Sequence, residues 1–145
     1  MRISIGCDHG GLEYKDALIK ELREKGHEII DCGTYTKESC DYPDFARKAA
    51  ELVARGEVEK GIVICTSGEG VCITANKVKG VRCGLGYNDE VAALMRQHND
   101  CNMIAFAQKF MKFEDVKRRA EIFLSTEFEG GRHQRRVEKM MEIEK

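Results

Sequence analysis

Five short apolar runs alternate along this chain with longer segments whose apolar residues recur at helical spacing. Runs of this length suit strands that are buried on both faces of a sheet, and an intervening helix is the usual connection between parallel strands. The alternation therefore predicts an α/β fold in which a five-stranded parallel sheet carries helices on both faces. The expected strands are 2–7, 27–32, 60–65, 81–86 and 103–107.

The expected helices have recognisable ends. Asn88 is a good N-cap, and Pro43 falls in a first helical turn, where its missing N–H costs nothing. The last helix is amphipathic, so its apolar stripe has to dock on its own domain or on a second subunit. The sequence predicts helices at 12–25, from 41 to the glycine at 56, at 71–78, from 88 to the loop at 97–102, at 113–126 and at about 131–144.

The bulk properties exclude several classes of protein. A length of 145 residues suggests a single domain over 1–145, and a net charge of −1 argues against a general nucleic-acid binder. The seven cysteines include no C-x-x-C pair and no zinc-ligand spacing, which favours a reduced, cytoplasmic protein without a metal. The chain begins directly with a strand pattern, so we expect no signal peptide, and no apolar run approaches the ~20 residues that span a bilayer.

The third apolar run ends at Cys65 and leads into a loop of small residues, Thr66 to Gly70. Ligands collect at the carboxyl ends of strands in open sheets, and a loop before a helix offers backbone N–H groups to negative charge. The loop lacks the endings of a P-loop and a dinucleotide fingerprint, and Val71 stands where a tyrosine-phosphatase loop needs arginine. The alternatives are a base at Cys65 or a buried cysteine before an ordinary glycine turn.

Other polar residues follow or precede strands. Asp8 and His9 come after the first strand and Tyr42 after the second, whereas His98 and Asn99 lie just before the fifth, where the sequence places them less firmly. Each has an ordinary structural explanation, such as capping by Asp8. Gathered on one edge of the sheet with a cysteine and an anion loop, they fit acid/base chemistry on a small polar ligand.

The last helix carries Arg132 and Arg136, four residues apart and therefore pointing the same way. Two neighbouring guanidinium groups match the oxygens of a phosphate. Because Arg135 and Lys139 lie on the same helix, a solvated basic face is the alternative.

Several motifs occur in order along the whole chain: Gly-Cys-Asp-His at 6–9, Asp-Tyr-Pro at 41–43, Ala-Asn-Lys at 75–77, Arg-Gln-His-Asn-Asp at 96–100 and Gly-Gly-Arg-His-Gln-Arg-Arg at 130–136. Together they resemble the type B ribose-5-phosphate isomerases. That family also includes allose-6-phosphate isomerase and the galactose-6-phosphate isomerase subunits. The resemblance implies a Rossmann-like three-layer α/β/α sandwich, a homodimer or homotetramer with active sites shared between subunits, and no metal or cofactor.

The resemblance also implies an activity: reversible isomerisation of ribose 5-phosphate and ribulose 5-phosphate through an enediolate. Cys65 would be the base that moves the proton between carbons, and His98 would open the sugar ring. The backbone of residues 66–70 would hold the oxyanion. The residues implied to contact the sugar phosphate are Asp8, His9, Tyr42, Thr66, Ser67, Gly68, Glu69, Gly70, Asn99, Lys109, Arg132 and Arg136.

Three positions depart from the family pattern. Thr66 replaces a usual glycine, Glu69 replaces a usual apolar residue, and Lys109 stands where many members carry arginine. We expect the Glu69 side chain to point away from the sugar. Two other functions stay open: isomerisation of allose 6-phosphate or another aldose 6-phosphate, and phosphometabolite binding without turnover.

Overall fold

The computed structural model describes residues 1–145 and contains one parallel sheet of five strands in the order β2-β1-β3-β5-β4. The strands are β1 (Arg2–Cys7), β2 (Glu28–Asp31), β3 (Lys60–Cys65), β4 (Cys83–Leu85) and β5 (Met103–Ala107). The helices are α1 (Leu12–Glu24), α2 (Tyr42–Ala54), α3 (Glu69–Asn76), α4 (Asp89–Gln97), α5 (Phe113–Ser125) and α6 (Arg132–Glu142), with a short 3₁₀ turn at His9–Gly11. The predicted Rossmann-like α/β fold is confirmed.

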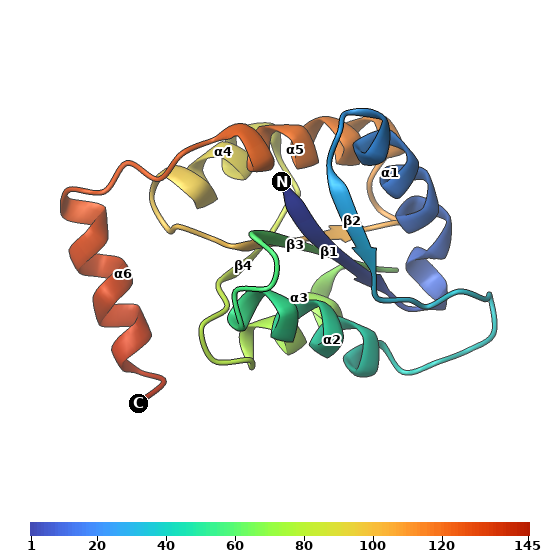
Figure 1. The fold of residues 1–145 in the computed structure, drawn as a ribbon, viewed down its shortest axis with the longest axis horizontal. Coiled ribbons are helices and arrows are strands. Elements are labelled where there is room, and N and C mark those ends of the chain that lie inside the picture. Colours follow the sequence, from blue (N-terminus) through green and yellow to red (C-terminus); the bar gives the residue numbers. More distant parts are fainter.

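Helices cover both faces of the sheet and form three layers (Figure 1). Successive side chains of a strand point to opposite faces, so each buried strand supplies two cores. Ile62 and Ile64 of β3 pack toward α1, α4 and α5, whereas Val63 and Cys65 pack toward α2 and α3. The side chain of Cys65 therefore lies on the α2/α3 side of the sheet.

The predicted element ends hold with small differences. Helix α3 begins at Glu69 rather than Val71, because Gly68 adopts a left-handed conformation (φ +77°) that turns the chain directly into the helix. Strand β4 is shorter than predicted, since the N–H of Arg82 donates to the side chain of Asn102 instead of to a neighbouring strand. Asn88 caps α4 as expected, because its side chain accepts hydrogen bonds from the N–H groups of Glu90 and Val91.

Strand order determines where a ligand can enter. From β1 the chain passes to β2 on one side and then returns to β3 on the other side of β1. The connections that follow β1 and β3 consequently leave toward opposite faces, to α1 and to α3. In open α/β sheets the crevice at such a switch point is the usual ligand site.

Helix α6 stands apart from the sandwich, beyond an extended segment that follows α5 (Figure 1). At its far end Glu144 accepts from the N–H of Gly80 at 3.0 Å and Met141 lies 3.5 Å from Arg82. None of the helices combines the length and the apolar character that crossing a bilayer demands.

Candidate active site

The loops after β1 and β3 meet at the switch point. The carboxylate of Asp8 accepts the N–H of Gly10 at 2.9 Å, which closes the turn after β1. Gly10 lies directly against the hydroxyl of Thr66, so that a methyl group on its Cα would collide with this oxygen. Close approach of these two loops requires glycine at position 10 and brings Asp8 beside the loop that Cys65 begins.

Cys65 ends β3 and is 5 % exposed. Its Sγ accepts the N–H of Gly68 at 3.2 Å. The chain after β5 holds this loop from the side, since the N–H of Gln108 donates to the carbonyl of Cys65 at 2.9 Å and that of Lys109 to Thr66 at 3.2 Å. The thiol is thus fixed at the carboxyl edge of the sheet.

The loop also presents unused backbone donors. The N–H of Glu69 donates to the Ser67 hydroxyl at 3.2 Å, but the N–H groups of Ser67, Gly70 and Val71 make no hydrogen bond within the chain. Gly70 and Val71 belong to the first turn of α3, where helix geometry leaves donors without partners, and Ser67 precedes the N-cap residue Gly68. Such donors next to a base suit an oxyanion that forms during reaction.

Two further predicted residues surround this loop. A methyl group on Gly70 would lie 2.6 Å from the ring of Tyr42, so the tyrosine at the start of α2 packs directly over the start of α3. His9 is exposed, and its Nδ1 accepts the N–H of Cys40 at 3.2 Å, which leaves Nε2 free for a ligand. The sequence-predicted residues gathered here form the carboxyl-edge set: Asp8, His9, Tyr42, Cys65, Thr66, Ser67, Gly68, Glu69, Gly70 and Lys109.

The remaining predicted residues lie elsewhere. Helix α4 runs back against the strand direction and ends at His98, ahead of the start of β5. The His98 ring stacks on His133 of α6 with centroids 4.1 Å apart and planes 10° from parallel. Because His133 lies between Arg132 and Arg136 in sequence, this stack brings the start of α6 to the end of α4. We call His98, Asn99, Arg132 and Arg136 the amino-edge set.

The expectation that all of these residues share one edge of the sheet is wrong for His98 and Asn99. Six residue steps along β5 separate Asn102, which follows the amino-edge set, from Gln108, which bonds to Cys65. At ~3.3 Å per step the two edges are roughly 20 Å apart, whereas proton transfer needs about 3 Å. One chain therefore does not bring His98 to Cys65.

Neither Arg132 nor Arg136 forms an ion pair within the chain, and both are exposed. Other arginines, such as Arg96 and Arg118, are paired with carboxylates at 2.8 and 2.7 Å. The two cations on α6 are thus available for an anion that comes from outside the chain.

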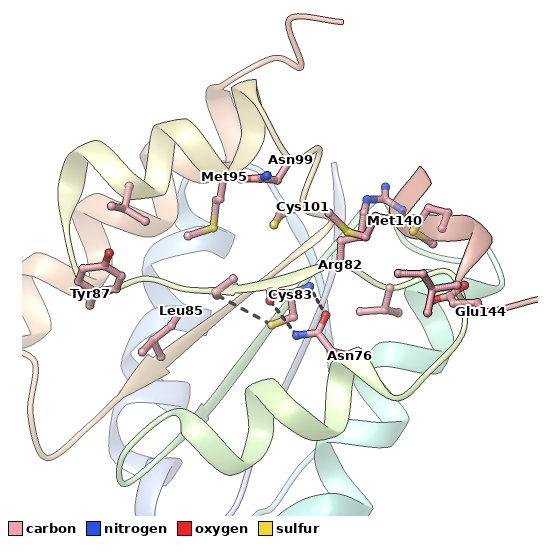
Figure 2. Close-up of a pocket in the computed structure, with 15 residues that line it drawn as sticks. Asn76, Arg82, Cys83, Leu85, Tyr87, Met95, Asn99, Cys101, Met140 and Glu144 are labelled. Carbon is pink, nitrogen blue, oxygen red and sulfur yellow. Dashed lines mark hydrogen bonds between the residues drawn. The ribbon is translucent and has the colours of Figure 1, made fainter. Parts of the chain in front are cut away.

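Two hollows of ≈ 580 Å³ flank the sheet. One lies at the carboxyl edge beside Ser67 and Glu69. The other is mainly apolar and lies between β4, α4 and the end of α6, with Asn99 at its margin (Figure 2). Asn76 forms part of its wall and is held there by two hydrogen bonds to the backbone of Cys83, at 2.7 and 2.9 Å.

Burial affects the ionisation of three other thiols. It raises the pKa of Cys7 and of Cys101 to about 12 and that of Cys32 to about 11, so these three stay protonated at neutral pH. Burial also lowers the pKa of His133, and the neighbouring His98 and Arg132 lower it further. The lowered pKa favours the neutral form of the His133 ring.

Sequence reasoning missed three residues that contact these sets. Gln108 anchors the loop at Cys65, while Glu129 and His133 lie beside His98. The Oε1 atom of Glu129 is 3.8 Å from Nε2 of His98 and 3.6 Å from Nε2 of His133. Only His133 left a signal in the sequence, since it stands inside the Gly-Gly-Arg-His motif.

Comparison with known proteins agrees with this architecture. The model of the family described as Ribose/Galactose Isomerase matches residues 3–140. Ribose-5-phosphate isomerase B of Escherichia coli is 43 % identical over 143 residues, covering 99 % of this chain and 96 % of that protein.

Solved structures are equally similar. Clostridium thermocellum ribose-5-phosphate isomerase B superposes with a TM-score of 0.98 at 44 % identity, covering 99 % of this chain and 97 % of the other. The Mycoplasma genitalium enzyme, solved with bound ribulose-5-phosphate, has a TM-score of 0.95 at 39 % identity, with 99 % and 95 % covered. The chain accordingly belongs to the ribose/galactose isomerase family.

Proposed function

We propose that this protein interconverts ribose 5-phosphate and ribulose 5-phosphate. The observation that carries the proposal is the Cys65 thiol at the switch point, next to three N–H groups that have no partner in the chain. Abstraction of a proton next to a carbonyl needs a base and a fixed group of donors for the oxyanion, and this loop offers both. The names of the relatives support the same substrate.

The reaction proceeds in balanced proton transfers. The Cys65 thiolate removes the proton from C2 of the open-chain aldose, and the electron pair moves onto the carbonyl oxygen to form an enediolate. The N–H groups of Ser67, Gly70 and Val71 stabilise that oxygen. The proton then returns from sulfur to C1 while the proton of the C2 hydroxyl passes to the C1 oxygen, which gives the ketose without a metal or a cofactor.

We further propose that the site is completed by a second copy of the chain. His98, Asn99, Arg132 and Arg136 of that copy would meet the carboxyl-edge set, with His98 opening the ring and the arginines holding the phosphate. The detached position of α6 supports docking of this helix on a partner subunit, in a homodimer or homotetramer (Figure 1). The whole chain, 1–145, would then be one isomerase domain that works in the cytoplasm.

A Cys65→Ala variant tests the central assignment. We expect it to fold and to bind the sugar phosphate but to lose isomerase activity and the exchange of solvent deuterium into C2. Cys72→Ala, which removes a thiol from the same helix region, is the matched control and should retain activity. An active Cys65→Ala protein would show that another group is the base.

The choice of sugar is tested by comparing kcat/KM for ribose 5-phosphate and allose 6-phosphate. We expect ribose 5-phosphate to be preferred. A preference for allose 6-phosphate would retain the chemistry but change the substrate. Binding of either sugar without turnover would instead leave a phosphometabolite-binding module.

A further inference from the structure

We propose that His98, Glu129 and His133 form a binding site for one divalent transition-metal ion, with Zn²⁺ as the representative ion. The Nε2 atom of His98 lies 3.8 Å from Oε1 of Glu129, and the Nε2 atom of His133 lies 3.6 Å from the same oxygen. All three potential ligand atoms lie within 4.8 Å of one another.

These separations are too long for direct hydrogen bonds but close to those of ligands that share one ion. Zinc–nitrogen and zinc–oxygen bonds of about 2.1 Å in a tetrahedron place two ligand atoms roughly 3.4 Å apart. A contraction of less than 1.5 Å in each pair therefore closes the site. No other side chain competes for these atoms, because none of them makes a hydrogen bond within the chain.

The three side chains have different freedom to make this adjustment. His133 is fixed, with 11 % of its side chain exposed, whereas the side chains of His98 and Glu129 are 40 % and 51 % exposed. The stacked rings lie in nearly parallel planes, so lone pairs within those planes do not converge on one ion, and the exposed His98 ring has to rotate toward that of His133. The backbone of Glu129 is already held in place, since its N–H donates to the carbonyl of Gln97 at 3.1 Å.

The chemistry of the donors selects the class of ion. Two imidazoles and one carboxylate suit Zn²⁺ and its neighbours in the first transition row rather than Mg²⁺ or Ca²⁺, which prefer oxygen. Three protein ligands leave a fourth position open for water or an anion. The positive charges of Arg132 and Arg136 nearby oppose a dication, so we expect affinity well below that of a closed structural zinc site.

Occupation of this site would inhibit the enzyme, a consequence that rests on the proposed function. A metal ion on Nε2 of His98 takes the lone pair that ring opening requires, and it holds the ring turned toward α6. The proton transfers proposed above use no ion, so the metal would act as an inhibitor and not as a cofactor.

The binding test uses the full-length, metal-free protein and Zn²⁺ alone, titrated in a calorimeter under reducing conditions. We expect about one ion per chain, and a loss of affinity of about tenfold or more in Glu129→Gln and in His133→Gln, since even outer-shell partners contribute that much. Cys40→Ser and His27→Gln are matched controls that remove a partly exposed thiol and a distant histidine, and both should bind as the unmodified chain does.

Co²⁺ identifies the ligands, because a cysteine thiolate bound to it gives an intense near-ultraviolet charge-transfer band that imidazole and carboxylate do not. The proposal predicts Co²⁺ binding without this band. Equal affinity in all variants, a thiolate band, or no binding would overturn the site.

Activity assays distinguish the proposed isomerase function from the proposed metal site. Isomerase activity of the metal-free chain tests the proposed function on its own, while Zn²⁺ binding tests the site on its own. In an active enzyme we expect Zn²⁺ to inhibit reversibly, with a chelator restoring turnover and His133→Gln shifting the inhibiting concentration upward by about tenfold. Binding without inhibition would refute the regulatory part.

Discussion

At the scale of single residues, Gly68 is a position where the site tolerates little change. Its φ of +77° disfavours any side chain, and a methyl group there would lie 2.8 Å from Leu85 and 3.1 Å from the backbone of Phe106. Gly68 also donates the N–H that the Cys65 sulfur accepts. Backbone strain and crowding thus act together at the point where the loop turns into α3.

We predict that Gly68→Ala lowers the free energy of unfolding by about 1–3 kcal/mol and reduces kcat strongly. Urea denaturation and an isomerase assay measure the two effects. Gly56→Ala is the matched control, because Gly56 has φ +74° but no atom within 4 Å of the added methyl group. It should lose stability through strain alone and keep its activity; equal losses of activity in both variants would contradict the role of the loop.

The buried thiols give a second residue-level prediction. Burial raises the pKa values of Cys7 and Cys101 to about 12 and that of Cys32 to about 11, so only a very small fraction is thiolate at pH 8. Iodoacetamide at that pH should leave these three unmodified in the native protein, while the partly exposed Cys40 reacts. Peptide mass spectrometry reads the pattern, and modification of Cys7 before Cys40 would contradict it.

Reasoning from strand ends placed Cys65, Asp8 and the 66–70 loop at the carboxyl edge, because a side chain that follows a strand has little freedom of position. The same reasoning misplaced His98. It precedes a strand, and the direction of the helix before it decides which edge it occupies. The contact of Glu129 and His133 with His98 could not be predicted from the sequence, because it depends on how the segment after α5 returns to α4.

At the scale of elements, substitutions on α6 test phosphate binding separately from the chemistry at Cys65. Arg136 is exposed and without an ion pair, and so is Arg135, which points to a different side of the helix. We predict that Arg136→Ala raises KM by about 10- to 100-fold, the loss expected for a hydrogen bond to a charged group, with a smaller change in kcat. Arg135→Ala should leave KM unchanged, and equal effects would favour a diffuse basic face.

The elements themselves were largely predictable. Alternating apolar runs and helical stretches fixed their number, order and type, since each depends on residues close in sequence. The ends of the elements were less predictable. Helix α3 starts two residues earlier than predicted because Gly68 makes the turn, and β4 is shorter because the N–H of Arg82 donates to the side chain of Asn102. Both ends depend on contacts between distant residues or on backbone conformation.

At the scale of the whole molecule, the separation of the two sets of residues predicts complementation between inactive chains. Cys65→Ala and His98→Asn should each be nearly inactive alone. When the two are refolded together, half of the dimers are mixed, and each mixed dimer has one intact site of two, which restores about a quarter of the unmodified activity. A steady-state assay measures the recovery. A mixture as inactive as its components would show that sites are not shared.

The strand order has a consequence for how the protein folds during its synthesis. Strand β5 lies between β3 and β4, so the sheet stays open in its middle until residue 107 has been synthesised. The carbonyls of Cys65 and Thr66 find their partners only in the two residues after β5. On the ribosome, β1, β2 and β3 can pair early, but the reactive loop acquires its final shape among the last events of folding. A nascent or truncated chain therefore carries the cysteine without its catalytic setting.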